Sequence, residues 1–259
     1  MKSVKLSLTV VFLAVSVCAY SIDGYGVMKS VEDRKTPSTT HALVKLELID
    51  AGGSVSERII EQWSREEGGK DASVIVFHSP ASVKNSRFLI LAEEGKDDAK
   101  YIYLPALKKV RRIAASEGDS SFMGTEFTYN DMSDRELDDY DYTLLGEEEV
   151  DGRICYIVES VPKAGTDSSY FKAVAWIVKD PEILTPVKID MYEDKDTVIK
   201  RFTVAVLENV DGFWIPTEVS MKNLKTGNET VMIQQRLELN TSVNGRLFST
   251  RFLETGKVR

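Results

Sequence analysis

The most regular hydrophobic pattern lies in the C-terminal part of the chain, where apolar and polar positions alternate with a period of two. In residues 213–221 the apolar positions are Phe213, Ile215, Val219 and Met221. After the turn sequence KTGN at residues 225–228, the apolar positions are Val231, Ile233, Leu237 and Leu239. One apolar face with this period is typical of antiparallel strands in a sheet that is wetted on one side.

Short turn signals separate other β-rich runs. KIDMY and TVIKRFTVAVLENV are joined by EDKD, and Asp211–Gly212 marks the hairpin that follows. YDYTLLGEEEV and RICYIVESV flank Asp151–Gly152 in the same way. Asp-Gly between two such runs favours a tight hairpin. With the runs of the N-terminal half, TTHALVKLELI to AKYIYLP, the pattern predicts eleven or twelve strands, largely a meander.

Helical patterns are scarce. Residues 21–35 carry apolar positions on one helical face, and PASVKN (80–85) and residues 129–140 favour short helices. No composition break or long linker divides the chain, which predicts a single domain. A long antiparallel meander avoids exposed edges by closing into a barrel or by curling over a helix, and a curled sheet encloses space for helices or a ligand.

The first residues are typical of a secretory signal peptide. Lys2 and Lys5 precede an uncharged apolar run at residues 6–17, which is too short to span a bilayer alone. Small residues at 17–19 predict cleavage after Ala19, leaving residues 20–259 as the mature domain. Alternatively, Cys18 is the lipid-accepting residue of a lipoprotein signal. Either reading predicts an exported protein, and no later run is long and apolar enough to span a membrane.

The net charge limits the classes of binding partner, and the cysteine content limits the disulfides that the protein can form. The formal net charge is −8, and it becomes −10 when Lys2 and Lys5 are removed with the signal peptide. This balance disfavours nucleic acid, because phosphate binding requires a cationic surface. Cleavage leaves Cys155 as the remaining cysteine, so no intramolecular disulfide is predicted. Cys155 lies in an apolar strand, which favours a structural role.

Signatures of catalysis and of resident cofactors are absent from the sequence. It lacks a Gly-x-Ser-x-Gly elbow, a phosphate-binding Walker loop and a His-Glu-x-x-His motif. His41 and His78 lie within strand-like runs, which favours hydrogen-bonded structural roles. We therefore predict no enzyme activity, cofactor or metal. A less favoured alternative is a lipid or glycan hydrolase that uses Glu126 and Asp131 as paired carboxylates.

One basic concentration stands out in this acidic chain, and it consists of Lys108, Lys109, Arg111 and Arg112. It either blunts a strand edge or contacts anionic headgroups or an acidic partner. The segment SSFMGTEFTYNDM (120–132) follows, with Phe122, Met123, Phe127 and Tyr129 around Gly124. These apolar side chains either fill the inside of the sheet or cover an apolar ligand.

Residues 100–132, KYIYLPALKKVRRIAASEGDSSFMGTEFTYNDM, resemble the LolA-like outer-membrane lipoprotein-sorting family. In that family a YLPAL-K-VRRI strand pair precedes an SFMGT-F-Y-D segment. Residues 188–232 resemble the C-terminal meander of the same family, so the resemblance covers almost the whole mature chain. It implies a mainly β (α+β) fold: an open, strongly curled antiparallel half-barrel of about 11 strands wrapped over a few short helices. It also implies an apolar cavity for acyl chains.

These observations predict a periplasmic carrier that passes lipoprotein or lipid acyl chains from an inner-membrane transporter toward an outer-membrane acceptor. Peripheral membrane contact through the basic stretch is part of this prediction. Strand phase gives the candidate lipid-binding residues Trp63, Phe88, Phe122, Met123, Phe127, Tyr129, Trp176 and Met221. The main alternative is an envelope interaction or scaffolding module that binds a protein partner through its surface and transports no ligand.

Overall fold

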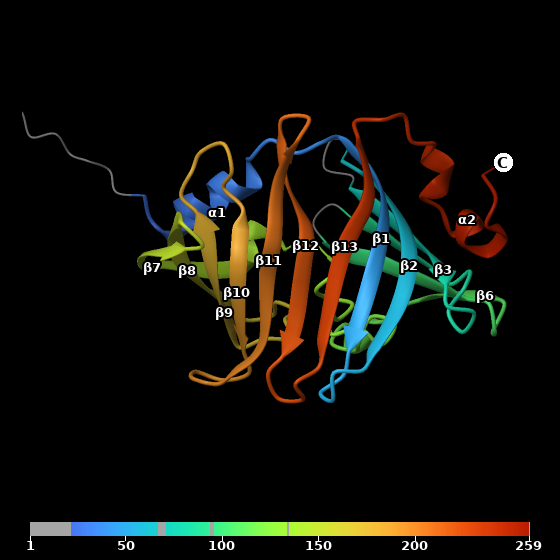
Figure 1. The fold of residues 1–259 in the computed structure, drawn as a ribbon, viewed down its shortest axis with the longest axis horizontal. Coiled ribbons are helices and arrows are strands. Elements are labelled where there is room, and N and C mark those ends of the chain that lie inside the picture. The colour runs from blue at the N-terminus through green and yellow to red at the C-terminus, as the bar shows by residue number, and fades with distance from the viewer. Residues whose placement is uncertain (1–21, 67–70, 94–95, 134, 259) are drawn as a thin grey trace, which may run out of the picture.

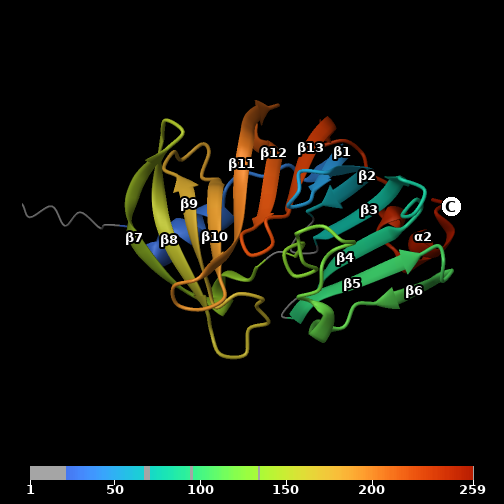
Figure 2. The ribbon, with the colours of Figure 1, turned by 60° about the horizontal axis from the view of Figure 1, so that its bottom comes forward.

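The computed structural model describes residues 22–66, 71–93, 96–133 and 135–258. Within them, one antiparallel sheet of 13 strands curls around a concave face (Figures 1 and 2). The strands are β1 (Thr39–Ile49), β2 (Val55–Arg65), β3 (Ala72–Ser79), β4 (Arg87–Glu93), β5 (Lys96–Leu104), β6 (Lys109–Arg112), β7 (Tyr140–Val150), β8 (Arg153–Pro162), β9 (Lys172–Val178), β10 (Pro186–Tyr192), β11 (Val198–Val210), β12 (Phe213–Asn223) and β13 (Glu229–Leu239). The predicted curled half-barrel is confirmed, with slightly more strands than expected. The predicted signal peptide and Cys18 lie outside the described residues.

The strand order shows how the chain builds this sheet. It runs β6-β5-β4-β3-β2-β1-β13-β12-β11-β10-β9-β8-β7. The first and last strands pair in the middle, with Thr40 opposite Leu239 and Ile49 opposite Glu229. One half of the sheet is therefore built outward from β1 to the β6 edge, and the other inward from the β7 edge to β13. Between β6 and β7 the chain must cross from one edge of the sheet to the other.

The predicted Asp-Gly hairpins are present. Asp151 and Gly152 have φ angles of 49° and 76°, and Asp211 and Gly212 have 51° and 85°. Two successive left-handed residues match the right-handed twist of the flanking strands, and aspartate and glycine tolerate this conformation best. These turns join β7 to β8 and β11 to β12.

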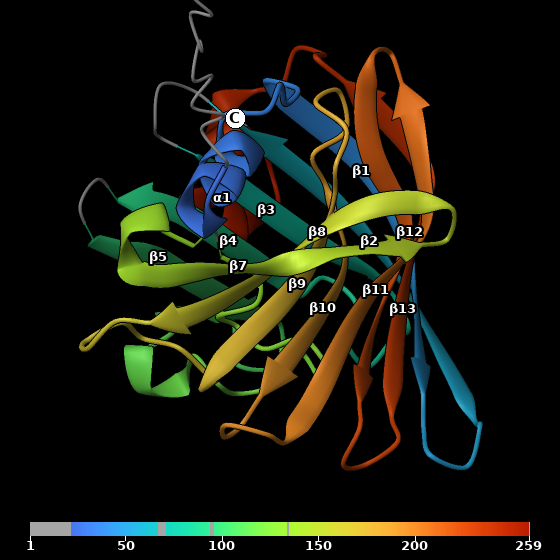
Figure 3. The ribbon, with the colours of Figure 1, turned by 90° about the vertical axis from the view of Figure 1, so that its left-hand side faces the viewer.

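Two α-helices lie on opposite faces of the sheet. Helix α1 (Gly24–Glu32) begins after Asp23, whose carboxylate caps the Gly26 N–H, and it lies on the concave face (Figure 3). It packs over β7, β8 and β9 through Val27, Val31, Val158 and Ile177. Helix α2 (Thr250–Thr255) covers the convex face of β3 to β6, where its apolar side is buried in a cluster that includes Phe252, Leu253, Val74 and Leu89 (Figure 1).

Two of the three predicted helices are not present as such in the part of the chain that the structure describes. PASVKN, residues 80–85, forms turns between β3 and β4 and not a helix. Of the helix predicted over residues 129–140, the described residues retain the 3₁₀ turn η2 (Leu137–Asp139). The other 3₁₀ turns are η1 (Ala115–Glu117) and η3 (Gly245–Leu247). The helix predicted in residues 21–35 is confirmed as α1.

Candidate functional site

The segment that crosses between the two sheet edges lies against the concave face, and we call residues 114–133 the strap (Figure 2). It folds back on itself, and the Phe122 N–H donates to the Phe127 carbonyl at 2.7 Å. At the tip, Met123 and Gly124 have φ angles of 53° and 80°. Glycine adopts this left-handed conformation without a Cβ penalty, which explains Gly124 at the turn.

Aromatic side chains hold the strap against the first half of the sheet. The Phe122 ring centroid lies 5.0 Å from that of Phe88 on β4 and 6.0 Å from that of Phe77 on β3. The Tyr129 ring lies 5.6 Å from Phe88 and meets Phe122 edge to face at 5.8 Å. All four rings are buried. Such tilted pairs add about 0.5–1.5 kcal/mol each beyond the burial of area.

Phe127 attaches the strap to the second half of the sheet. Its ring is buried in a cluster contributed by β9, β10, β12 and the loop before β9, consisting of Tyr170, Ala173, Met191 and Met221. The strap therefore packs against both halves of the curled sheet and links them across the concave face.

Glu126 is held by three strands of the second half. Its carbonyl accepts from Lys200 Nζ at 2.7 Å, and its N–H donates to Thr230 Oγ1 at 3.0 Å. Its carboxylate accepts from Asn223 Nδ2 at 3.0 Å. Because these partners come from β11, β13 and β12, the strap position is fixed by directional contacts as well as by packing.

Asp131 is a second polar anchor, and its side chain is only 5% exposed. Its carboxylate accepts from the Thr128 N–H at 2.8 Å and from the Tyr170 hydroxyl at 3.0 Å, with Lys200 Nζ at 3.8 Å. Burial, followed by the nearby Asp131 carboxylate, raises the pKa of Tyr170. The Asp131 oxygens are thus engaged by internal donors, which is the arrangement of a structural anchor.

Beside the strap, a cavity of about 350 Å³ opens on the concave face. Its lining is mostly polar and charged, with Gln62, Arg65, Glu66 and Asp71 among its members, and it includes the apolar Ile90 and Met132. A second cavity of about 100 Å³ shares Thr40 and Gln62 with it. This second part reaches β12 and β13 and is lined mostly by apolar residues, among them Ala42, Val44, Val219 and Met232, together with Gln234. We call the two contiguous cavities the hollow.

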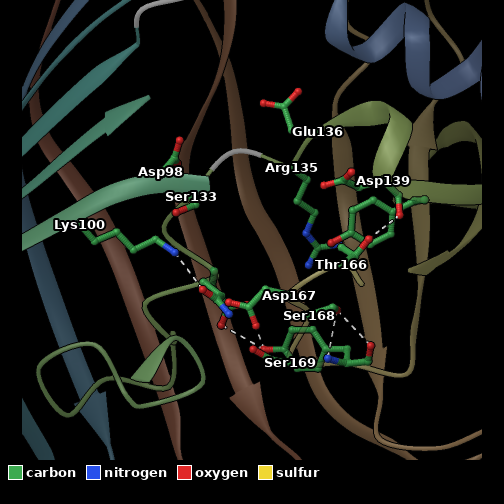
Figure 4. Close-up of a pocket in the computed structure, with 14 residues that line it drawn as sticks. Asp98, Lys100, Ser133, Arg135, Glu136, Asp139, Thr166, Asp167, Ser168 and Ser169 are labelled. Carbon is green, nitrogen blue, oxygen red and sulfur yellow. Dashed lines mark hydrogen bonds between the residues drawn. The ribbon is translucent and has the colours of Figure 1, made fainter. Parts of the chain in front are cut away.

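A polar pocket adjoins the hollow at Asp98, which borders both (Figure 4). Lys100 points toward the strap, where its ammonium donates to Asn130 Oδ1 at 2.8 Å. The Arg135 guanidinium lies 5.7 Å from the centre of the Tyr140 ring. A further cavity of about 390 Å³ shares Asp98, Lys100 and Asn130 with this pocket and reaches β6. The hollow therefore has an apolar part at β12 and β13, and its larger part is continuous with polar surroundings.

The structure brings together most of the residues predicted to bind lipid. Five of them are buried beneath or within the strap: Phe88, Phe122, Phe127, Tyr129 and Met221. Met123 is partly buried beside them. None of these six borders the two cavities of the hollow. They pack the strap to the sheet, and the hollow lies next to them.

The prediction that Trp63 and Trp176 line the cavity is corrected, because both residues lie on the convex face of the sheet. Trp63 stacks on His41 with ring centroids 4.9 Å apart and packs with the cluster under α2. Trp176 lies under the Lys188 ammonium at 3.6 Å and donates to Glu148 at 2.5 Å. In β2 and β9, strand phase groups residues that share a face, but it does not say which face is concave.

Sequence analysis missed several residues that border the hollow: Thr40, Gln62, Met232 and Gln234. Their common signal is cross-strand register. Gln234 lies opposite Val44, and Met232 lies opposite both Leu46 and Val219. This register becomes available only when β1 and β13 are known to pair.

The four basic residues separate into two groups. Arg111 forms an ion pair with Glu117, with Nη1–oxygen distances of 2.7 and 2.9 Å. Lys108, Lys109 and Arg112 are exposed and form no ion pair within the described part of the chain. The free positive charge of this stretch therefore lies at the β5–β6 hairpin.

The histidines and the buried cysteine have the expected structural environments. His41 and His78 each contact a carboxylate oxygen of Glu61 at 2.8 Å. Cys155 is fully buried, and burial raises the pKa of its thiol. Among the described residues, no group of three or more His, Cys, Asp or Glu side chains could hold a metal ion. In the same residues, no helix is long and apolar enough to cross a bilayer.

Comparison with known proteins places this geometry in a family. No curated protein matches the chain by sequence. A family model matches residues 69–255, and its description reads "-like: Uncharacterized protein". The crystal structure of a DUF1329 family protein from Desulfovibrio piger is 30% identical, covers 89% of this chain and 97% of that one, and has a TM-score of 0.83.

Two further crystal structures share the fold. A putative outer membrane lipoprotein-sorting protein domain from Vibrio parahaemolyticus is 27% identical over 89% of this chain and 98% of that one, with a TM-score of 0.83. A LolA superfamily protein from Nitrosomonas europaea is 17% identical over 90% and 100% of the two chains, with a TM-score of 0.69. The chain belongs to the DUF1329 family, and its fold is LolA-like.

Proposed function

We propose that this protein is a periplasmic carrier that binds acyl chains of a lipid or lipoprotein and passes them toward the outer membrane. Residues 20–259 form one lipid-binding domain in this proposal, and residues 1–19 direct export. The observation that carries it is the hollow, an open space inside the curled sheet whose smaller part is lined mostly by apolar side chains and whose larger part is mostly polar. The relative from Vibrio parahaemolyticus, described by lipoprotein sorting, supports the same role.

Transfer of an acyl chain between membranes requires a cavity that keeps the chain out of water. Burying a methylene is worth about 0.8 kcal/mol, so a chain of about sixteen carbons represents on the order of 12 kcal/mol against water. Release through bulk water would be too slow for transport. A carrier must therefore cover the chain and hand it to an acceptor of similar apolar character. Met132 and Met232 give the hollow two flexible thioether side chains, which adapt to irregular apolar contents.

The volume of the hollow limits what it holds without rearrangement. Its larger part, about 350 Å³, is at the low end of the roughly 300–1,000 Å³ typical of ligand pockets. A single acyl chain of about sixteen carbons would occupy both parts of the hollow, with its polar end at the Asp98 side. A cargo with two or more chains requires the strap to leave its place, because Phe122 and Phe127 occupy the adjoining interior.

No covalent chemistry is part of the proposal. Asp131, one of the paired carboxylates considered above, is engaged by the Thr128 N–H and the Tyr170 hydroxyl. The three relatives are described by lipoprotein sorting, as a LolA superfamily member or as a DUF1329 protein, and not by a reaction.

Neighbouring residues on β13 provide a matched test. Met232 borders the hollow, whereas Ile233 points to the other face of the sheet. In titrations with a fluorescent fatty acid, Met232→Trp fills the hollow and should weaken binding about tenfold or more, since a mismatched volume in a packed apolar site costs about 1–3 kcal/mol. Ile233→Trp should bind like the wild type. Equal binding by both variants would contradict the proposal.

One observation favours the alternative of an envelope interaction module. The strap buries Phe122, Phe127 and Tyr129 against the sheet, so the protein's own residues fill much of the concave interior. In that case the purified protein binds no fatty acid, and substitution of Lys108 and Lys109 abolishes binding of a protein partner. The fluorescent fatty acid titration therefore separates the two functions.

A further inference from the structure

The tip of the β5–β6 hairpin exposes an apolar side chain. Leu107 is 64% exposed, the highest value among the large apolar residues in the described ranges. The backbone there is well defined, because the N–H groups of Leu107 and Lys108 both donate to the Leu104 carbonyl at 3.0 Å. Leu107 is therefore held away from the core by a tight turn, and its exposure does not come from a loose end of the chain.

Uncompensated positive charge surrounds this leucine. Lys108 and Lys109 follow it directly, and Arg112 ends the same short strand, all exposed and without an ion pair in the described residues. The protein as a whole carries a net charge of −8. A local cluster of cations in an acidic protein gives the tip an electrostatic preference that the rest of the surface lacks.

We propose that this tip docks the protein onto an anionic lipid surface. Leu107 enters the boundary between headgroups and acyl chains, and Lys108 and Lys109 contact lipid phosphates. A single protruding apolar side chain flanked by lysines forms no groove or pocket for a protein segment. A fluid bilayer, in contrast, adapts to a convex tip, and apolar insertion adds to the attraction of opposite charges.

The tip is connected to the cavities through strand β6. Arg112 at the end of this strand and Ile113 directly after it border the cavity of about 390 Å³ next to the polar pocket. Docking through the tip would bring this side of the concave face close to the membrane. Docking through the tip does not depend on what the hollow holds. The docking proposal and the carrier proposal can therefore fail separately.

Vesicle sedimentation tests the docking proposal with the mature protein. Phosphatidylcholine vesicles with phosphatidylglycerol should bind the protein, vesicles without it should not, and added salt should weaken the binding. Lys108→Gln with Lys109→Gln should reduce the affinity about 25-fold, because each basic residue near an anionic surface contributes about fivefold. Leu107→Ser should reduce it about tenfold.

Leu145→Ser is the matched control, because Leu145 is another exposed leucine, on the acidic edge strand β7, with 53% exposure. It should sediment like the wild type. The proposal is overturned if the wild-type protein does not bind the anionic vesicles or binds both kinds of vesicle equally. It is also overturned if the tip binds an acidic protein and no vesicle. Equal effects of Leu107→Ser and Leu145→Ser also overturn it. Fatty acid titration of the same variants, expected to be unchanged, separates loss of docking from loss of cargo.

Discussion

The Tyr170 hydroxyl donates a hydrogen bond to the Asp131 carboxylate at 3.0 Å, and this contact joins the loop before β9 to the strap. Both side chains are buried, so the bond is formed away from water, where an unpaired partner is costly. With the contacts of Glu126 to three strands, it fixes the strap between the two halves of the sheet.

Removing this donor should destabilise the protein. Tyr170→Phe leaves the buried Asp131 carboxylate with fewer donors and should lower the free energy of unfolding by about 1–3 kcal/mol. Urea denaturation followed by circular dichroism measures the change. Tyr25→Phe is the control, because the Tyr25 hydroxyl donates to Asp138 at 3.3 Å on the exposed surface. Its effect should stay within about 0.5 kcal/mol, and equal losses would contradict the anchoring role of Tyr170.

Locking the strap to the sheet should prevent binding of a two-chain lipid and leave binding of a single fatty acid unchanged. The Glu126 N–H donates to Thr230 Oγ1 at 3.0 Å, so Glu126→Cys with Thr230→Cys is the pair in which we test for a disulfide, and its formation is checked by non-reducing electrophoresis. When oxidised, this variant should still bind a fluorescent fatty acid in the hollow. It should lose binding of a fluorescent two-chain phospholipid, and a reductant should restore it.

Each single-cysteine variant controls for the loss of the native side chain, and the native Cys155 is buried. Two-chain binding that is indifferent to oxidation would show that the strap does not have to move. Loss of both ligands on oxidation would show that even one chain needs the strap to open.

Stability should fall at alkaline pH in part through Tyr142. Burial, followed by the neighbouring Tyr140, raises the pKa of Tyr142 from 10.0 to about 12. The folded protein therefore holds this proton more tightly than the unfolded chain. The resulting stabilisation is fully present below pH 10 and is lost as the pH rises toward 12. Tyr142→Phe should flatten the fall of unfolding free energy over this range, and an unchanged slope would refute the assignment.

Local patterns predicted the hairpins well, because the information that specifies them lies within a few residues. Asp151–Gly152 and Asp211–Gly212 combine a turn signal with flanking alternation, and each joins the strands expected. The pairing of β1 with β13 has no such local signal, since Thr40 and Leu239 are far apart in sequence. Nor does any period show that the chain must cross from the β6 edge to the β7 edge, which follows from the strand order.

Strand phase was less informative about the candidate site. In β13 the pattern groups Val231 and Ile233 with Leu237, but the register shifts between Leu43 and Val44 on the paired strand. Gln234 pairs with Val44 and Arg236 with Leu43, so an extra residue is accommodated and the phase changes. Leu237 and Met232 therefore pack with the concave cluster. A β-bulge of this kind cannot be read from alternation, which assumes an uninterrupted ladder.

Lipid mass spectrometry of protein purified from its native envelope tests most directly whether the hollow shelters a hydrocarbon chain. An acyl lipid should co-purify with the wild type and with Ile233→Trp, and it should be depleted in Met232→Trp, whose added ring occupies the hollow. Wild-type protein recovered repeatedly without lipid, from envelopes in which it is natively expressed, would contradict the carrier function.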